Sequence, residues 1–158
     1  MPVPDFILTM REKLGTDLIW MPGVSAVVLD DDGRVLLGQR ADNGQWGLIT
    51  GILDPGEEPA VGAVREVAEE TGVVARVEHL ASISAGRPVT FPNGDRAQFL
   101  DLTFRCRYVA GEARVADDES LAVGWYAVDD LPDSVPPHQR WRLQTALTAT
   151  GVPVFARD

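Results

Sequence analysis

Three glutamates that could bind a metal ion, Glu66, Glu69 and Glu70, fall within one short stretch of the chain. At about 100° per residue, a helix would place them on a common arc that points away from its apolar face. Glu66 and Glu70 would form a like-charge (i, i+4) pair, which costs about 0.2–0.5 kcal/mol. Positions 63, 71 and 73 offer no basic residue to neutralise them.

The position of these glutamates in the helix adds a second cost. Glu69 and Glu70 would lie in the last turn, where the helix dipole disfavours an exposed anion by about 0.3–1 kcal/mol. A hard divalent cation bound by carboxylate oxygens would offset both costs. The pattern therefore predicts a magnesium site, with a solvated acidic helix face as the alternative.

The helix that carries the glutamates has clear end signals. Pro59 suits the first helical position and Gly72 suits the position just after a helix, so we expect about 13 residues between them. The predicted core face contains Val64, Val67 and Thr71, and it is flanked by Val61, Ala63 and Ala68.

The remaining elements follow from apolar periodicity and from glycine and proline positions. Residues 24–29 and 34–40 are expected to pair as a hairpin, and 46–53 to form a strand broken by Gly47 and Gly51. Mixed helices and strands, with mostly hairpin-connected strands, predict an α+β fold. Further strands are expected over 73–84, 97–109 and 121–128, and helices over about 5–14 and 138–150.

Composition limits the class of protein and its partners. The chain has 158 residues and a formal net charge of −10, which suits one folded domain and disfavours long nucleic acid or an anionic membrane as a partner. An anionic small substrate would need a bound cation. Charges interrupt every apolar run near the N-terminus, and Cys106 is the single cysteine, so we expect a cytoplasmic protein without an intrachain disulfide.

The full spacing around the glutamates resembles the signature of the Nudix (MutT-like) hydrolases. Residues 51–73 match G-x5-E-x7-R-E-U-x-E-E-x-G-U, where U is apolar, at every fixed position. Seven fixed identities would arise by chance at about 10⁻⁸ per starting point. The resemblance implies a single Nudix domain over 1–158, with a mixed sheet packed between helices as an α/β/α sandwich.

The resemblance also implies roles for the signature residues. Glu66, Glu69 and Glu70 would bind Mg²⁺ or Mn²⁺ together with the backbone carbonyl of Gly51, a position where the absence of Cβ lets the main chain approach an ion. Glu57 and Arg65 would form a pair that ties the loop to the helix, with Glu57 as an additional metal ligand in the alternative. The family's common Pro-Gly before the signature glycine is replaced here by residues 49–50, Ile-Thr, which weakens inference about the substrate contact made there.

The implied reaction is hydrolysis of a nucleoside diphosphate linked to another moiety X, giving a nucleoside monophosphate and P-X. Candidates are ADP-ribose, a nucleoside triphosphate or a nucleotide sugar. In the family, a proline at about this distance after the signature accompanies ADP-ribose hydrolases. The resemblance of Pro88, 15 residues after Val73, to that proline gives ADP-ribose a modest lead. The alternative is a Nudix-like module that senses a nucleotide without cleaving it, and a homodimer is left open.

Further site residues are expected outside the signature. A carboxylate that holds a cation is a poor base, so a carboxylate outside the signature is wanted. The resemblance implies Glu119 as the proton acceptor or another metal ligand, because the family often places a catalytic glutamate in the loop before the corresponding strand, here 121–128. Glu66 and Glu70 complete the expected catalytic set. Residues 117 and 118, both aspartates, could take this role instead of Glu119. The alternative without a catalytic role is a solvated acidic loop. The resemblance implies that Arg40 contacts a phosphate or tethers a loop, and the alternative is a surface ion pair. Trp46 would stack on a base or pack in the core or at an edge.

Overall fold

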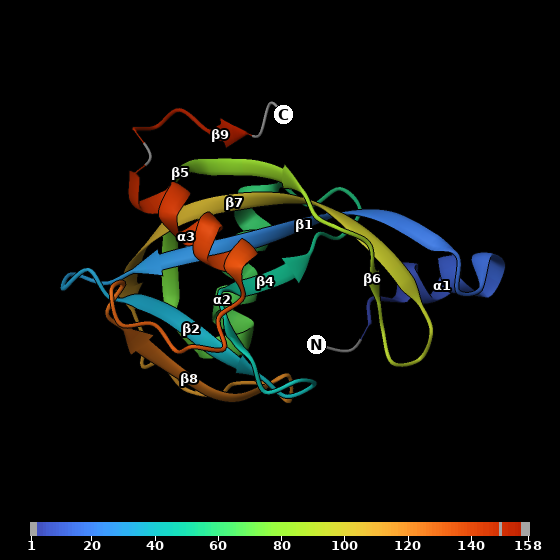
Figure 1. Ribbon diagram of the computed structural model, residues 1–158, viewed down its shortest axis with the longest axis horizontal. Coiled ribbons are helices and arrows are strands. Elements are labelled where there is room, and N and C mark those ends of the chain that lie inside the picture. Colours follow the sequence, from blue (N-terminus) through green and yellow to red (C-terminus); the bar gives the residue numbers. More distant parts are fainter. Residues whose placement is uncertain (1–2, 149, 156–158) are drawn as a thin grey trace.

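The computed structural model describes residues 3–148 and 150–155 (Figure 1). Within these residues, nine strands form one mixed sheet, accompanied by helices α1 (Asp5–Leu14), α2 (Pro59–Thr71) and α3 (Pro137–Thr148). The α+β prediction is confirmed. In the described residues no helix is both long and apolar enough to cross a membrane.

The sheet is organised around β1. β1 pairs in parallel with β7 along its whole length and antiparallel with β4. On one side of the sheet, β2 pairs with both β3 and β8. On the other side, β5 pairs with both β7 and β9. The strands are β1 (Leu18–Leu29), β2 (Val35–Arg40), β3 (Trp46–Gly47), β4 (Ile49–Ile52), β5 (Val74–Ala85), β6 (Val89–Thr90), β7 (Arg96–Ala110), β8 (Ser120–Tyr126) and β9 (Val154–Phe155).

The predicted hairpin between the first two strands is wrong beyond its turn. β1 and β2 pair only at Leu29 and Val35, next to the turn. β1 then continues to Leu18 between β4 and β7, and β2 diverges to pair with β8. Pairing with strands that are distant in the sequence therefore replaces most of the local hairpin.

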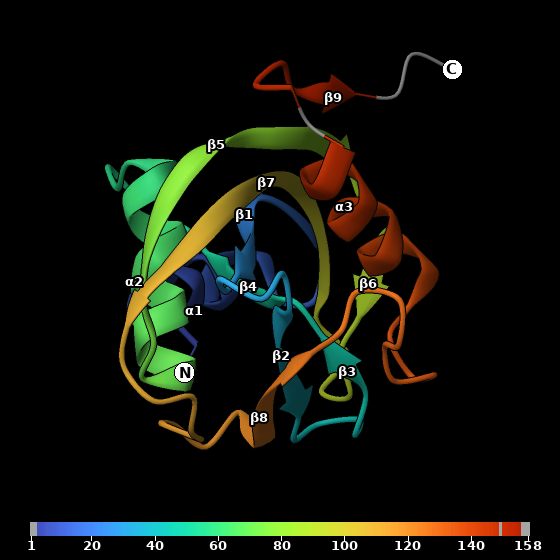
Figure 2. The same ribbon diagram turned by 90° about the vertical axis from the view of Figure 1, so that its left-hand side faces the viewer.

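Helices α2 and α3 cover opposite sides of the central strands (Figure 2). Successive side chains of a strand face opposite ways. Val24 and Ala26 of β1 accordingly join a core cluster with Val67 of α2, whereas Val27 joins a second cluster with Leu143 of α3. This arrangement matches the sandwich expected from the sequence.

Polar contacts fix α3 onto the strands near the candidate site. Arg142 lies 3.2 Å from Asp101 of β7 (Nε to Oδ1), and Ser25 of β1 donates to the other oxygen of the same carboxylate at 2.7 Å. Gln139 accepts a hydrogen bond from the backbone N–H of Leu48 at 2.6 Å. The Gln139 contact ties the short connection between β3 and β4 to α3, and the Arg142–Asp101 pair ties α3 to β7.

The ends of the chain differ little from expectation. α1 has the predicted bounds and packs against the first part of β1 through Ile7 and Ile19. α3 ends at Thr148 instead of Thr150, and the intervening residue 149 lies outside the described residues. The short strands β6 and β9 were not predicted.

Candidate active site

The helix α2 has the predicted bounds because its end residues carry the expected conformations. Pro59 is at the start, and Gly72 follows the last residue with φ 68°, in the left-handed region that glycine adopts without steric cost. The Gly72 N–H donates to the carbonyl of Ala68 at 3.0 Å. The three glutamates are thereby fixed in the second half of the helix.

The predicted outward arc of glutamates is wrong for two of the three. The Glu66 residue is 2% exposed and the Glu70 residue 9%, whereas the Glu69 side chain is 47% exposed. The helix lies against the loop after β4, where a Cβ on Gly62 would overlap Leu53. With the helix in this position, Glu66 and Glu70 lie on its buried side. The buried residues of α2 are Gly62, Ala63, Glu66, Val67, Glu70 and Thr71.

Arg65 connects three carboxylates, so the expectation that no local cation compensates the signature glutamates is wrong for Glu66 and Glu69. Its Nε and Nη2 contact the two oxygens of Glu57 at 2.7 and 2.9 Å. Its Nη1 donates to Glu66 at 3.0 Å and to Glu69 at 3.1 Å. These contacts lower the pKa of Glu57 and raise that of Arg65. The structure thus places the expected loop partner, Glu57, against Arg65.

The absence of a side chain at Gly51 makes room for a buried carboxylate. A Cβ at this position would overlap the Glu66 carboxyl group. Gly51 lies in β4, opposite Val24 of β1, so the strand cannot easily move away. The backbone of β4 and the Glu66 carboxylate therefore lie in direct contact.

Burial makes the two inner carboxylates unusually basic. Desolvation raises the pKa of Glu66 to about 7, against the opposing effect of Arg65. Desolvation also raises the pKa of Glu70 to about 8, and the charges of Glu66 and Asp117 add to the rise. Such raised pKa values are typical of carboxylates in functional sites, where the group binds a cation or carries a proton.

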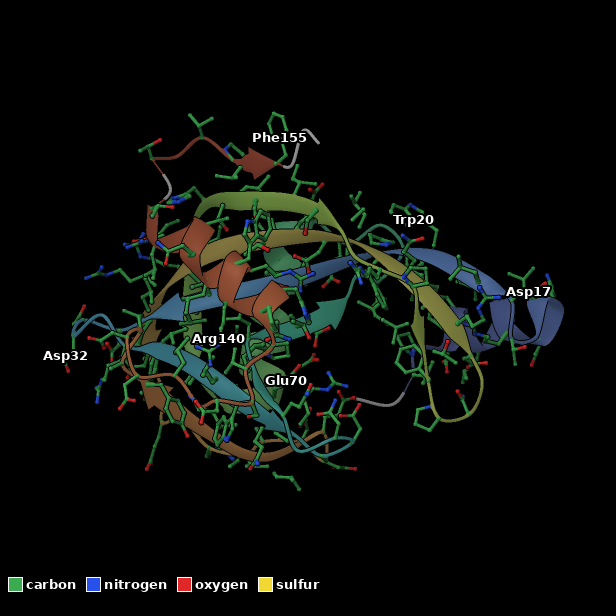
Figure 3. All side chains as sticks on the ribbon, in the orientation of Figure 1. Asp17, Trp20, Asp32, Glu70, Arg140 and Phe155 are labelled. Atoms are coloured by element: carbon green, nitrogen blue, oxygen red, sulfur yellow. The ribbon has the colours of Figure 1, made fainter. Side chains whose placement is uncertain are left out.

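A small cavity brings together residues from three separate elements. Arg40 comes from the end of β2, Glu70 from α2 and Glu119 from the segment just before β8. In Figure 3 Glu70 lies near the middle of the molecule, well away from Asp32 at the β1–β2 turn. The cavity is lined by Gly38, Arg40, Leu48, Thr50, Glu70, Glu119 and Ser120.

The pairing of β2 with β8 places Arg40 and Glu119 side by side. The register shifts between Gln39 and Arg40, so that Arg40 lies opposite Ser120. The backbone N–H of Ala41 donates to the carbonyl of Glu119 at 2.7 Å. Such a bulge bends a strand and redirects its side chains, and here it occurs where Arg40 enters the cavity.

The structure places Trp46 outside this cavity. Its ring meets Tyr126 edge-on, with ring centroids 4.9 Å apart, and it packs against the α3-side core. This aromatic contact accounts for its partial burial.

The predicted metal ligands are close in sequence but not gathered around one point. Among the described residues, no group of three or more His, Cys, Asp or Glu side chains is arranged to hold a metal ion. Glu66 and Glu69 are instead bound by Nη1 of Arg65. Chemically the set fits a hard cation, because it offers buried carboxylate oxygens beside a glycine backbone.

Two residues of the site were not found from the sequence. The first is Asp42, whose carboxylate binds the guanidinium of Arg40 at the edge of the cavity and so gives Arg40 the surface ion pair that was one of its expected roles. Gly62 lets the helix approach the loop, and its signal was available, since an interior helical glycine costs about 1 kcal/mol relative to alanine.

Comparison with known proteins now identifies the family. The family model described as NUDIX domain matches residues 20–145. The chain is a Nudix hydrolase. A MutT-like protein from Streptomyces ambofaciens is 36% identical over 135 residues, covering 85% of this chain and 82% of the relative.

Two further comparisons extend this result. The NAD-capped RNA hydrolase NudC of Escherichia coli O157:H7 is 34% identical over 113 residues, which cover 70% of this Nudix hydrolase but only 41% of NudC. The crystal structure of a MutT NUDIX hydrolase from Burkholderia pseudomallei has a TM-score of 0.67 and 29% identity, covering 80% of this chain and 98% of that chain.

Proposed function

We propose that this Nudix hydrolase cleaves the pyrophosphate link of a nucleoside diphosphate joined to a moiety X, in a reaction that depends on Mg²⁺ or Mn²⁺. The products are a nucleoside monophosphate and P-X. The observation that carries the proposal is the pair of buried carboxylates, Glu66 and Glu70, with raised pKa values, of which Glu70 lines a cavity that also holds Arg40.

Each side chain has a role in this proposal. Glu66, Glu69 and Glu70, with the Gly51 carbonyl, would hold the metal ion. When bound, the ion would neutralise charge on the phosphate oxygens and lower the pKa of a coordinated water. Arg65 would keep the Glu57 loop on the helix.

The proton acceptor is proposed to be Glu119. It lines the same cavity as Glu70, and it lies outside the metal-binding helix. Asp117 is the alternative, because its charge acts on Glu70 strongly enough to contribute to the raised pKa of that group. Either carboxylate would take the proton from the attacking water.

The alternative of a nucleotide sensor without catalysis is less well supported. The chain retains every glutamate of the signature, and two of them are buried where a charge is costly unless a cation is present. A module that only binds nucleotides has no need to keep such groups. Binding of a metal ion, as expected from the family, would give the two buried glutamates a function.

ADP-ribose leads the candidate substrates because of the position of Pro88. The relative NudC, a hydrolase of NAD-capped RNA, adds NAD as a substrate worth testing, although this chain spans less than half of NudC. The net charge of −10 disfavours a long RNA. A cytoplasmic location and a homodimer stay predictions.

The test is a substrate panel with product identification. ADP-ribose, nucleoside triphosphates, nucleotide sugars and NAD are each incubated with Mg²⁺, and parallel reactions contain a chelator. We expect a nucleoside monophosphate from at least one substrate, and the accompanying product identifies X. Reaction in isotopically labelled water shows which phosphorus is attacked. Saturable binding without turnover on any substrate would favour the sensor.

A further inference from the structure

Arg40 is bound by a carboxylate of its own loop. Its Nε lies 2.9 Å from Oδ1 of Asp42, and its Nη2 lies 2.7 Å from Oδ2. Arg40 is also the one basic side chain among the described residues that line the cavity with Glu70. The cation best placed to meet a phosphate therefore already has an anionic partner.

The backbone beneath this ion pair is held firmly. The N–H of Arg40 donates to the carbonyl of Gln45 at 2.9 Å, and its carbonyl accepts from the N–H of Gly44 at 2.9 Å. The Ala41 N–H donates to the backbone carbonyl of Glu119. The base of the arginine is thus fixed.

The charged ends of the pair are open to solvent. The side chains of Arg40 and Asp42 are 46% and 47% exposed. Hydrogen bonding to Arg40 holds the pKa of Asp42 below its usual range, so the carboxylate is ionised at neutral pH. An exposed ion pair contributes little stability and exchanges partners readily.

A carboxylate and a phosphate can both bind the edge of a guanidinium that Nε and Nη2 form. Both accept two parallel N–H bonds from the planar guanidinium. With its Nε and Nη2 bound to Asp42, Arg40 cannot offer that pair of donors to a phosphate at the same time.

We propose that Asp42 competes with the substrate phosphate for Arg40 and thereby weakens substrate binding by this Nudix hydrolase. This inference rests on the proposed function, because it takes Arg40 as a phosphate contact. Asp42 then lowers the affinity for substrate. A substrate whose phosphate cannot reach Arg40 should bind equally well with and without the Asp42 carboxylate. The opposite role, in which Asp42 holds Arg40 in the orientation that binds phosphate, predicts the opposite sign.

The test is a double-mutant cycle on ligand binding. The probe is α,β-methylene-ADP with Mg²⁺, titrated calorimetrically at low, fixed ionic strength into the wild type, Asp42→Asn, Arg40→Gln and the double variant. We expect Asp42→Asn to tighten binding about two- to fivefold, the range that competition with an exposed ion pair can produce. Arg40→Gln should weaken binding about tenfold. In the Arg40→Gln background, Asp42→Asn should change the affinity by less than about twofold.

Asp31→Asn is the matched control. Asp31 also forms an exposed pair with an arginine, Arg107, at 2.8 Å, but it lies at the β1–β2 turn. Its substitution removes the same charge away from the cavity, so the affinity should stay within about 1.5-fold of the wild type. Thermal melts confirm that each variant folds.

Each other outcome contradicts the inference. Weaker binding by Asp42→Asn shows an orienting role, and unchanged binding shows that the pair does not compete. An equal gain in the Arg40→Gln background shows a general charge effect. KM for a substrate from the panel should fall in parallel with Kd, and a change confined to kcat also contradicts competition. If the wild type neither binds nor hydrolyses any nucleotide, the proposed function itself fails.

Discussion

Replacement of Glu70 by glutamine tests whether the fold carries a buried carboxylate at a cost in stability. Burial and neighbouring charges raise the pKa of Glu70 from 4.5 to about 8. The folded state therefore holds this proton more tightly than the unfolded state. The contribution of this proton to stability is fully present below about pH 4.5, and in the metal-free protein it is lost as the pH rises toward 8.

The size of the effect follows from the pKa difference. Each unit of difference corresponds to about 1.4 kcal/mol. Between about pH 5 and pH 8, titration of Glu70 alone removes about 3.5 kcal/mol from the free energy of unfolding. Glutamine does not titrate, and loss of the neighbouring charge also lowers the pKa of Glu66. At about pH 8 the metal-free Glu70→Gln variant should thus be more stable than the wild type by about 2–4 kcal/mol.

The assay is urea denaturation in the presence of a chelator at several pH values and constant ionic strength. Glu12→Gln is the control, because it makes the same chemical change at an exposed position in α1. Its stability should follow the wild-type pH dependence. Excess Mg²⁺ at high pH should stabilise the wild type more than Glu70→Gln, since the metal binds the folded state. A flat wild-type profile, or the same slope in Glu70→Gln, would refute the reasoning.

Further substitutions probe three parts of the site. Arg65→Ala should lower the metal-free free energy of unfolding by about 2–3 kcal/mol, less than for a fully buried ion pair; melting equal to that of the wild type would exclude the tether. Gly51→Ala should displace Glu66, costing about 1–3 kcal/mol by thermal melt and at least about tenfold in kcat/KM; unchanged activity would show that the contact is dispensable. Amide variants at 117–119 should identify the base as the one that lowers kcat by about 10²–10⁴-fold with little change in KM; near-normal kcat in all three would leave Glu66 as the next candidate.

The bounds of α2 could be predicted because proline and glycine mark its ends through local backbone preferences. The orientation of the helix could not. The apolar pattern placed Val61 and Ala68 near the core, but both are exposed. Gly62 instead permits close contact with Leu53, and that contact depends on a loop whose position the sequence pattern does not define.

The strands show the same division between local and distant effects. Alternation and turn residues located most strands correctly. The predicted partner of β1 was wrong beyond the turn, because β4 and β7 pair with the rest of β1. The cavity forms because β8 pairs with β2 and brings Glu119 to Arg40. The family resemblance implied a site role for each of these two residues, but it did not predict that they meet. A surface ion pair of Arg40 was one expectation, and the structure was needed to identify Asp42 as its partner.

The most direct test of the metal-dependent mechanism is the rate of nucleoside monophosphate release as a function of Mg²⁺ concentration, for the wild type and Glu70→Gln. The best substrate from the panel is used at saturation. Wild-type activity should be absent in chelator and saturate with Mg²⁺ in the millimolar range, and Glu70→Gln should be at least about 10²-fold slower at every concentration. Full wild-type activity in chelator, or equal rates for the two proteins, would contradict metal binding by the buried carboxylates.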